Sequence, residues 1–397
     1  MSSTALTIDQ VKSFESSIGP TTESRMMPPF IYTNPSFYEF EKEAVFNHEW
    51  LCVGREEWVP TKGDYYTTEY LGEQLIVVRS GTDTISCLSA VCQHRGMLVA
   101  DGSGKCNLFR CPYHHWVYAL DGRLAGAPAM DKTKEWDKSK VALPSVRVES
   151  WQGFIFINFD KNAEALGSRM ARFEGALAHY DLANARGPKP DRFEDLPWNW
   201  KIMFENSNDG YHANRLHKSI LHDFCPSELN TWAEWREDDP AYLRRNRLTH
   251  IDGSWTPTQK VMLPVFPKLS EDERQQIMFL NLPPTLWLAL TPDQVYYFLM
   301  HPLAVDKTWI EAGGMFTPAA LEDPAFEHKL QAYKSTFQYF NNQDRYVDTL
   351  QQQGLGSRFA NRGRLSWQEE SSACFARWLT KRYREHYDQS KKLMIAA

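Results

Sequence analysis

Short hydrophobic runs separated by turn residues dominate residues 51–160, and runs of this length predict β-strands rather than helices. Residues 155–158 alternate poorly between apolar and polar, which is typical of a strand covered on both faces. Before this region, residues 36–50 show helical periodicity, and residues 1–25 are polar and rich in Ser and Thr, as in an N-terminal arm. The predicted strands are residues 74–79, 85–91, 109–111 and 151–159.

The hydrophobic pattern changes after residue 160. An amphipathic helix is predicted over residues 164–183, with Phe173, Leu177 and Tyr180 on one side, and a second helix over residues 201–216. Strand-like runs follow, and the last third is helical; the strands are expected at residues 261–266, 277–282, 286–290, 295–302 and 309–316, and the helices at 324–353 and 367–387. This order predicts an α+β protein with an arm and helix over residues 1–44, a β domain over 45–160 and a second domain over 161–397.

Length and composition narrow the class of protein. The chain has 397 residues, enough for two domains with cores of their own, and its net charge of −6 argues against a nucleic-acid-binding surface, which would be basic. No apolar run is long enough to span a bilayer, and the first ten residues lack the features of a signal peptide. Seven cysteines, an odd number, indicate a reducing compartment. We therefore expect a cytoplasmic protein with no membrane partner.

Two short loops carry the strongest chemical signal. Each offers one thiolate and one imidazole in the same order: Cys92 with His94, and Cys111 with His114. A Rieske [2Fe–2S] centre needs this supply, two Cys on one iron and two His on the other. The alternative is a structural zinc site, but zinc fingers usually place both Cys in one knuckle and both His in another. The interleaved order therefore favours the Rieske centre.

Two neighbours of these loops need a separate interpretation. His115 follows His114 and could also present an imidazole, so the register of the second loop is open to question. We keep His114 as the ligand and expect His115 to face solvent or a partner. Cys106 lies between the loops and is expected to be a small buried thiol.

A second signal lies between residues 205 and 217. Two His and one carboxylate form the facial triad of non-haem Fe(II) oxygenases, and His212 and His217 could supply the two imidazoles. Glu205, Asp209 and His212 share one face of the predicted helix. His217 lies five residues after His212, so the helix must loosen or end for both rings to reach one iron. By itself this spacing is weak, because two surface histidines would show it too.

Together the two signals resemble the α subunits of Rieske non-haem iron oxygenases, the aromatic-ring-hydroxylating family. The resemblance extends from about residue 25 to the end, although this family usually has Gly where this chain has His115. It implies a Rieske β domain followed by a helix-grip catalytic domain, in which a curved antiparallel sheet wraps over a long C-terminal helix. It also implies that the acid three residues before the first His, Asp209, bridges an iron-ligand His and a Rieske-ligand His.

The carboxylate ligand must then come from elsewhere, and we choose Asp344. Tyr333, Phe337 and Phe340 precede it at helical spacing, so Asp344 is one acid in an apolar stripe. An unpaired carboxylate on a buried face is costly, and a metal removes that cost. Its spacing to a following Gln and Gly also resembles the family's C-terminal signature. Asp348, one turn later, is the rival, and His222 is expected to be a pocket or surface histidine.

The resemblance also implies partners. Electrons pass from NAD(P)H through a separate reductase, with or without a ferredoxin, to the cluster and then to Fe(II), where O₂ is used to hydroxylate a substrate. The chain has no Gly-x-Gly-x-x-Gly fingerprint of its own, so it needs that reductase. The family assembles as a head-to-tail homotrimer in which one subunit's cluster faces its neighbour's iron, and Asp209 would lie at that junction. A β subunit is left open.

The sequence leaves the substrate open. Our leading interpretation is an aromatic compound, since Asp209 rather than Glu lies three residues before His212. The spacing from Glu205 to Asp209 and His212 is shorter than in naphthalene-type enzymes. It resembles the spacing in the branches of the family that oxidise glycine betaine and carnitine. Monooxygenation or N-demethylation of a quaternary amine is therefore the alternative. A Rieske electron-transfer protein with an inactive catalytic domain is a third possibility, which intact His212, His217 and Asp344 argue against.

Overall fold

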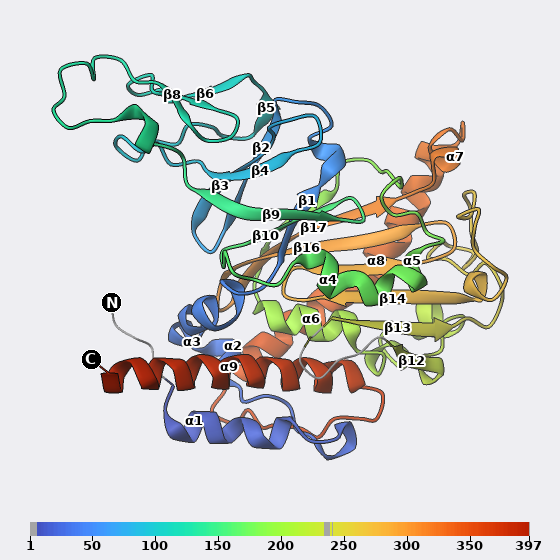
Figure 1. Cartoon of the computed structure of the whole chain (residues 1–397). Helices are drawn as coiled ribbons and strands as arrows, with labels where there is room; N and C mark the ends of the chain where they lie inside the picture. The colour runs from blue at the N-terminus through green and yellow to red at the C-terminus, as the bar shows by residue number, and fades with distance from the viewer. Residues whose placement is uncertain (1–5, 234–238, 240, 397) are drawn as a thin grey trace. The chain divides into compact units, whose positions relative to one another are not determined.

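The computed structural model describes residues 6–233, 239 and 241–396 (Figure 1). Asn47–Arg169 form one compact unit. The described residues up to Phe46 fold instead with those from Met170 onward, in a second unit. The N-terminal helices therefore belong to the same unit as the C-terminal helices.

The unit Asn47–Arg169 is built from two antiparallel sheets. Its seven-stranded sheet has the order β1-β10-β9-β4-β3-β2-β5, and its three-stranded sheet has the order β6-β7-β8. Ile76, Val78 and Leu88 from the large sheet pack with Phe109 and Tyr118 from the small one in a common core. The strands are β1 Leu51–Arg55, β2 Asp64–Tyr70, β3 Glu73–Arg79, β4 Ile85–Ser89, β5 Ser103–Lys105, β6 Leu108–Arg110, β7 Val117–Ala119, β8 Leu124–Gly126, β9 Ser145–Trp151 and β10 Phe154–Asn158.

The second unit contains a seven-stranded antiparallel sheet of order β11-β17-β16-β15-β14-β13-β12. From β14 to β17 the chain runs as a meander, so neighbours in sequence are neighbours in the sheet. β15 is buried along its whole length, as expected of a central strand. The strands are β11 Asp191–Leu196, β12 Asn230–Ala233, β13 Tyr242–Arg247, β14 Gln276–Leu282, β15 Leu286–Leu290, β16 Val295–Ala304 and β17 Lys307–Met315.

Helices pack on this sheet and on one another. Phe337 of α8 stacks on Tyr296 of β16 with ring centroids 3.8 Å apart, so the long helix lies directly against the sheet. Phe204 of α6 stacks on Phe375 of α9 at 4.5 Å. The predicted α+β fold, with a β domain before a sheet-and-long-helix domain, is confirmed. The helices are α1 Ile8–Ser13, α2 Phe30–Thr33, α3 Pro35–Glu41, α4 Leu166–Met170, α5 Glu174–Leu177, α6 Trp200–Asn208, α7 Pro318–Leu321, α8 Phe326–Leu355 and α9 Glu370–Ala396.

Two predicted helices differ from the structure. The helix predicted over residues 201–216 ends at Asn208, because Asp209 caps it in an extended conformation. The helix predicted over residues 164–183 is broken into α4, a 3₁₀ turn and α5. Gly167 and Gly175 weaken that stretch, since Gly is a poor helix former.

Two predicted strands also differ. Residues 261–266 form no strand, because the backbone N–H groups of Met262 and Leu263 donate to the carboxylate of Asp293 at 3.1 and 3.4 Å. The strand predicted over residues 151–159 contains a turn after Trp151, where β9 ends, and β10 begins at Phe154. Hydrophobicity alone does not show such a tight hairpin.

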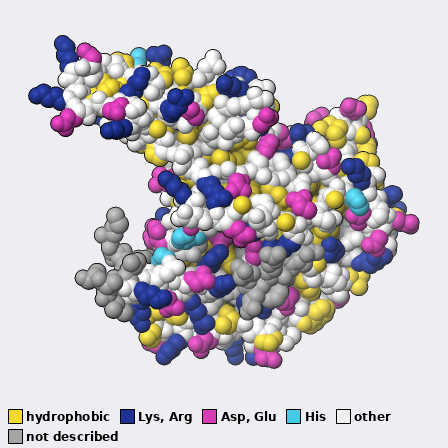
Figure 2. All heavy atoms as spheres, viewed as in Figure 1, with side chains coloured by type: hydrophobic (Ala, Val, Ile, Leu, Met, Phe, Trp, Pro, Cys, Tyr) yellow, Lys and Arg dark blue, Asp and Glu magenta, His cyan; other side chains and the backbone are white. Residues whose placement is uncertain are grey.

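The surface carries charges of both signs. Lys, Arg, Asp and Glu side chains are interspersed over the face shown in Figure 2. Among the residues that the structure describes, no helix is long and apolar enough to cross a membrane.

Candidate metal centres

The two Cys–His loops share one backbone arrangement. In the first, the N–H of Cys92 donates to the carbonyl of Met97 at 2.8 Å, and Val91 and Leu98 form a bridge that closes the loop. In the second, which joins β6 to β7, the N–H of Cys111 donates to the carbonyl of Trp116 at 2.8 Å. Each loop is therefore a closed turn that presents a thiol and an imidazole from the same positions.

The four predicted cluster residues have the burial and ring contacts of a ligand site. Cys92 and Cys111 are buried, and the rings of His94 and His114 lie 4.6 Å apart. His94 stacks on Trp116 with centroids 4.8 Å apart, which fixes its orientation. The buried Nδ1 of His114 finds no hydrogen-bond partner among the residues described. Two thiols and two adjacent imidazoles, one with an orphaned nitrogen, fit the donor set of a Rieske cluster.

Tyr118 contacts the first loop, and sequence reasoning missed it. Its hydroxyl lies 3.2 Å from Cys92 Sγ and accepts a hydrogen bond from the N–H of Gln93 at 3.0 Å. Because the hydroxyl oxygen accepts the N–H of Gln93, the hydroxyl proton can be donated to the sulfur of Cys92. Hydrogen bonds to ligand sulfurs tune the potential of iron–sulfur clusters. Tyr118 lies on the strand after the second loop, so only the paired β6–β7 geometry reveals this contact.

The structure also places the two neighbours of these loops. His115 is exposed and adopts φ +58°, the left-handed region that favours Gly. That backbone explains why Gly is usual at this position in the resembling family. Cys106 is half-buried and packs against the core of its unit.

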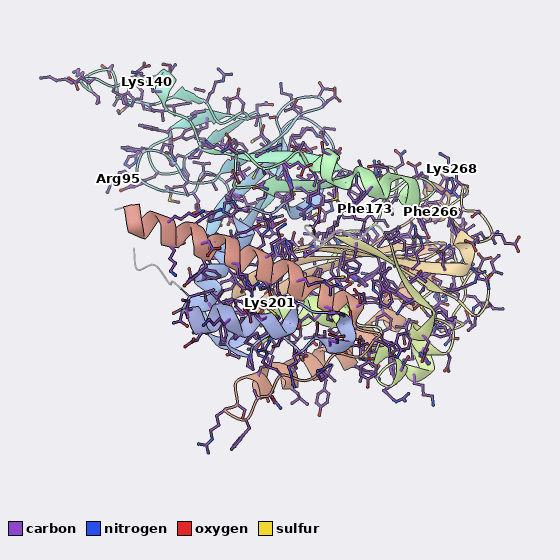
Figure 3. All side chains as sticks on the ribbon, turned by 60° about the horizontal axis from the view of Figure 1, so that its bottom comes forward. Arg95, Lys140, Phe173, Lys201, Phe266 and Lys268 are labelled. Atoms are coloured by element: carbon purple, nitrogen blue, oxygen red, sulfur yellow. The ribbon has the colours of Figure 1, made fainter. Side chains whose placement is uncertain are left out.

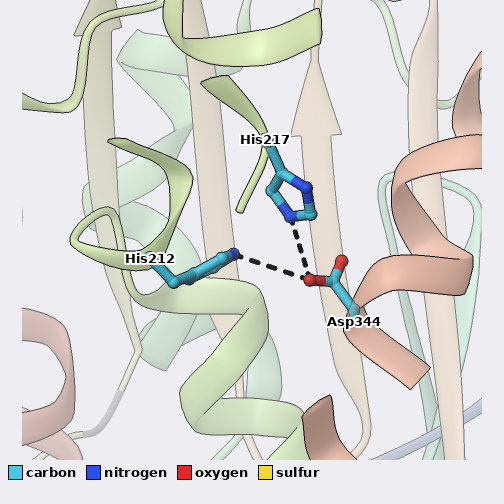
Figure 4. A group of neighbouring side chains, drawn as sticks. All are labelled: His212, His217 and Asp344. Carbon is cyan, nitrogen blue, oxygen red and sulfur yellow. Dashed lines mark hydrogen bonds and ion pairs between the residues drawn. The ribbon is translucent and has the colours of Figure 1, made fainter. Parts of the chain in front are cut away.

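The second predicted site is assembled from three segments. After α6 ends at Asn208, a 3₁₀ turn begins at His212, and His217 follows it, while α8 contributes Asp344. One ligand atom from each of these three residues lies within 4.8 Å of the others. Asp344 Oδ1 is 2.9 Å from His217 Nε2 and 3.7 Å from His212 Nε2 (Figure 4). Two imidazoles and a carboxylate converging in this way form the donor set of a facial-triad iron site.

Hydrogen bonds orient both imidazoles toward Asp344. His217 Nδ1 lies 2.9 Å from Gln343 Oε1, and His212 Nδ1 lies 3.3 Å from Asp209 Oδ2. Each ring therefore uses Nδ1 for an orienting acceptor and turns Nε2 to the centre of the group, which is ordinary support for metal ligands. Burial lowers the pKa of His212, but the hydrogen bond and charge of Asp209, with Asp344, outweigh it and raise the pKa.

Asp348, the rival ligand, has a different environment. It is buried, and its Oδ1 finds no hydrogen-bond partner among the described residues. Burial raises its pKa well above the usual value, and the charges of Asp344 and Glu205 raise it further. The structure brings Asp344, not Asp348, together with the two histidines. His222 is half-buried, with Nε2 3.7 Å from the carboxylate of Glu228.

A cavity opens beside the three residues. Several aromatic side chains line it, and its polar lining includes Arg244 and Asn230 from the paired strands β13 and β12. Aromatic walls with a few polar groups are typical of sites that bind small organic molecules. The aromatic residues of the wall are Trp198, Trp255, Phe279, Trp287, Phe298, Phe337 and Phe340.

Comparison with known families agrees with this geometry. The family model "Ring hydroxylating alpha subunit (catalytic domain)" matches residues 177–385, more than half of the chain. The chain belongs to this family. The model "Rieske [2Fe-2S] domain" matches residues 49–143, which contain both Cys–His loops. A Rieske domain followed by a ring-hydroxylating catalytic domain makes this chain a member of the Rieske oxygenases, whose cofactors are a [2Fe–2S] cluster and a mononuclear iron.

Similar proteins include quaternary ammonium monooxygenases and, among solved structures, the naphthalene 1,2-dioxygenase of Rhodococcus, which has a TM-score of 0.79 at 20% identity and covers 95% of this chain. The carnitine monooxygenase oxygenase subunit of Acinetobacter pittii is 33% identical over 192 residues, which cover 48% of this chain and 52% of that protein. The chain thus spans about half the length of such relatives. The glycine betaine monooxygenase oxygenase subunit of Chromohalobacter salexigens is 26% identical over 83% of this chain and 79% of its own length. The solved structure of a quaternary ammonium Rieske monooxygenase covers 94% of this chain and 98% of its own, with TM-score 0.78 and 23% identity, and shows the same fold.

Proposed function

We propose that this chain is the terminal oxygenase component of a multi-protein system. It would take electrons from a separate NAD(P)H-dependent reductase, directly or through a ferredoxin, and use them with O₂ to hydroxylate a small organic substrate. The observation that carries this proposal is the convergence of His212, His217 and Asp344 on the wall of the aromatic cavity, in a chain that also contains a Rieske domain. An electron carrier would need neither the triad nor the cavity.

The residues of the two metal centres and of the cavity have separate tasks in this proposal. His212, His217 and Asp344 would hold an iron ion, and Cys92, His94, Cys111 and His114 a Rieske cluster. When bound, the iron supplies open coordination positions for O₂ and so the oxidising chemistry. Gln343 and Asp209 orient the imidazoles, and the aromatic wall excludes water and positions the substrate.

The relatives favour a quaternary ammonium substrate over our leading sequence interpretation of an aromatic compound. Carnitine and glycine betaine monooxygenases act on quaternary amines, and a trimethylammonium group is attracted to the faces of Trp and Phe rings. Trp255 lies 5.5 Å from Phe340 and 6.4 Å from Trp287, centroid to centroid, so several ring faces are available. The same apolar wall also fits an aromatic ring, which keeps an aromatic substrate as the second candidate.

Assembly completes the proposal. A head-to-tail homotrimer would bring a neighbour's His94 or His114 to Asp209, which already contacts His212 within its own chain. A heterologous contact of this kind closes as a ring with three-fold symmetry. Sedimentation or light scattering should then give three chains per particle.

The test is turnover with a surrogate reductase, NADH and O₂, with product measured as well as NADH consumed. Glycine betaine and carnitine represent the quaternary amines, and naphthalene and benzoate represent the aromatic compounds. We expect O₂-dependent product from a quaternary amine in the wild type and none in His217→Ala, whose Rieske spectrum should persist. Product from aromatic compounds alone would select the second candidate. Reduction of the cluster without product from any substrate would contradict an oxygenase.

A further inference from the structure

Arg244 is a buried cation that faces the cavity. It lies on β13, only 5% of its surface is exposed, and its guanidinium carbon stands 4.0 Å above the ring of Phe279. Among the residues that the structure describes, no carboxylate forms an ion pair with it, although the charge of Asp209, which lines the same cavity, acts on it at longer range, and its Nε finds no hydrogen-bond partner. Burial lowers the pKa of Arg244, although a guanidinium stays protonated at any physiological pH. An unpaired charge in this position is costly unless a ligand pairs with it.

Asn230 is a second unsatisfied group at the same place. It is buried on β12, and neither its Oδ1 nor its Nδ2 finds a partner among the described residues. Asn230 pairs with Asn246 across the hairpin, which puts it on the same face as Arg244, two residues before Asn246. Both donors lie beside Gly210, since a Cβ there would meet Asn230 Nδ2 at 2.5 Å and Arg244 Nη1 at 3.3 Å.

The aromatic wall connects this pair with the iron-ligand residues. Phe340 lies 5.7 Å from the ring of His217, Trp255 lies 5.5 Å from Phe340, and Phe279 lies 6.2 Å from Trp255. Arg244 then covers Phe279. The metal-binding side chains and the Arg244–Asn230 pair also line the same cavity, so a molecule bound there is exposed to both groups.

We propose that Arg244 and Asn230 form a carboxylate subsite, so the substrate of this oxygenase is a small carboxylate. A carboxylate matches the planar fork of a guanidinium with two parallel hydrogen bonds, and the amide N–H₂ of Asn230 supplies a further donor. A subsite for a carboxylate and an aromatic wall for a quaternary ammonium group together select a zwitterion that carries both groups. This combination disfavours choline, which has the cation alone, and uncharged hydrocarbons. That the carboxylate bound here is a substrate rests on the proposed function; that it binds here does not.

The test compares binding of glycine betaine with binding of choline, which has the same trimethylammonium group but a hydroxyl in place of the carboxylate. Calorimetry on the anaerobic, metal-loaded full chain needs no turnover. We expect glycine betaine to bind at least about tenfold more tightly than choline. Arg244→Gln should weaken glycine betaine on the order of 100-fold and choline by less than threefold, since a buried charge pair is lost only for the carboxylate. Arg245→Gln, the next residue on β13 and outside the cavity wall, is the matched control and should leave both affinities unchanged.

Asn230→Asp keeps the inference testable if Arg244→Gln does not fold. The new carboxylate would pair with Arg244, so the ligand-free variant should melt at a higher temperature while its affinity for glycine betaine falls at least tenfold. Equal affinity of wild type for the two probes, no binding of either, or equal losses for both in Arg244→Gln would overturn the carboxylate subsite. These outcomes are independent of turnover: selective binding without product would contradict the proposed function and leave the subsite standing.

Discussion

His217 Nδ1 lies 2.9 Å from the side-chain oxygen of Gln343, the residue that directly precedes Asp344 on α8. One turn of one helix therefore supplies both a predicted metal ligand and the acceptor that orients another. When a metal binds at Nε2, the proton of His217 lies on Nδ1, which can donate it to the amide oxygen of Gln343.

Gln343→Leu should weaken mononuclear iron binding by about 10–100-fold, the usual cost of removing an orienting partner. The leucine has a similar size but cannot accept the proton of His217 Nδ1, so the ring is free to rotate. Iron content after dialysis against a graded chelator measures the effect. Gln353→Leu, an exposed position on the same helix, should behave as wild type. Unchanged iron retention in Gln343→Leu would show that His217 is held by other contacts.

Asp209→Asn tests the proposed electron path. The variant keeps an acceptor for His212 but loses the charge that stabilises its imidazole. Iron content and the Rieske spectrum should persist and the reductase should still reduce the cluster, while single-turnover reoxidation of the cluster with substrate and O₂ should slow by more than tenfold. Loss of mononuclear iron would make Asp209 a ligand in place of Asp344. Normal reoxidation would remove Asp209 from the path.

The local pattern predicted most elements of the fold but not where they stop. Residues 286–290 were predicted as a strand and form β15 with the same bounds, and every residue of this apolar run is buried in the middle of the sheet. The helix predicted over 201–216 ends early, since the cap at Asp209 outweighs helical periodicity. The strand predicted over residues 261–266 failed because Asp293, a distant residue, takes its backbone donors.

The residues of the candidate site also fall into those that the sequence predicted and those that only the structure revealed. His212, His217 and Asp344 could be chosen because metal ligands are restricted to a few residue types and because the chain resembles a family with this donor set; their spacing alone was a weak signal. Gln343, Tyr118 and Arg244 carry no such signal, since an amide, a phenol or a guanidinium is common anywhere on a chain. Their roles become visible only in the folded structure, where they lie beside a ligand residue or are buried without a hydrogen-bond partner.

Lys201 and Glu41 form a buried ion pair that joins α6 to α3. Lys201 Nζ lies 2.8 Å from both carboxylate oxygens, both side chains are fully buried, and the hydroxyl of Tyr383 also donates to Glu41 (Figure 3 shows Lys201 among the helices). Burial raises the pKa of Glu41 and lowers that of Lys201, so each depends on the other for its charge. Removing one partner leaves the other charge buried and unpaired.

Lys201→Met should therefore lower the free energy of unfolding by about 3–5 kcal/mol. Combining it with Glu41→Gln, which keeps an acceptor for Tyr383 but no charge, should recover at least half of the loss. Lys42→Met, which breaks the exposed pair with Glu39, should cost less than about 1 kcal/mol. Urea denaturation of the four proteins makes the comparison. A double variant no more stable than Lys201→Met would show that charge pairing is not the main role of these residues.

Glu205 should make stability fall as pH rises. It accepts a hydrogen bond from Tyr32 at 2.7 Å, and burial raises its pKa from 4.5 to about 7. Between these two values the unfolded chain has released the proton and the folded chain retains it, so the folded state binds more protons and stability decreases with increasing pH. Glu205→Gln should remove up to about 3 kcal/mol of this loss between pH 4.5 and 7. Exposed Glu322→Gln is the control, and an unchanged pH slope in Glu205→Gln would contradict the assignment.

The central claim is that one chain holds two different iron sites, a Rieske cluster and a mononuclear iron at His212, His217 and Asp344. Iron and acid-labile sulfide, measured together on the purified protein, test it most directly. We predict about three iron atoms and about two sulfides per chain in the wild type, and about two of each in Asp344→Ala. Two irons per chain in the wild type, or the same iron content in Asp344→Ala as in the wild type, would contradict the account.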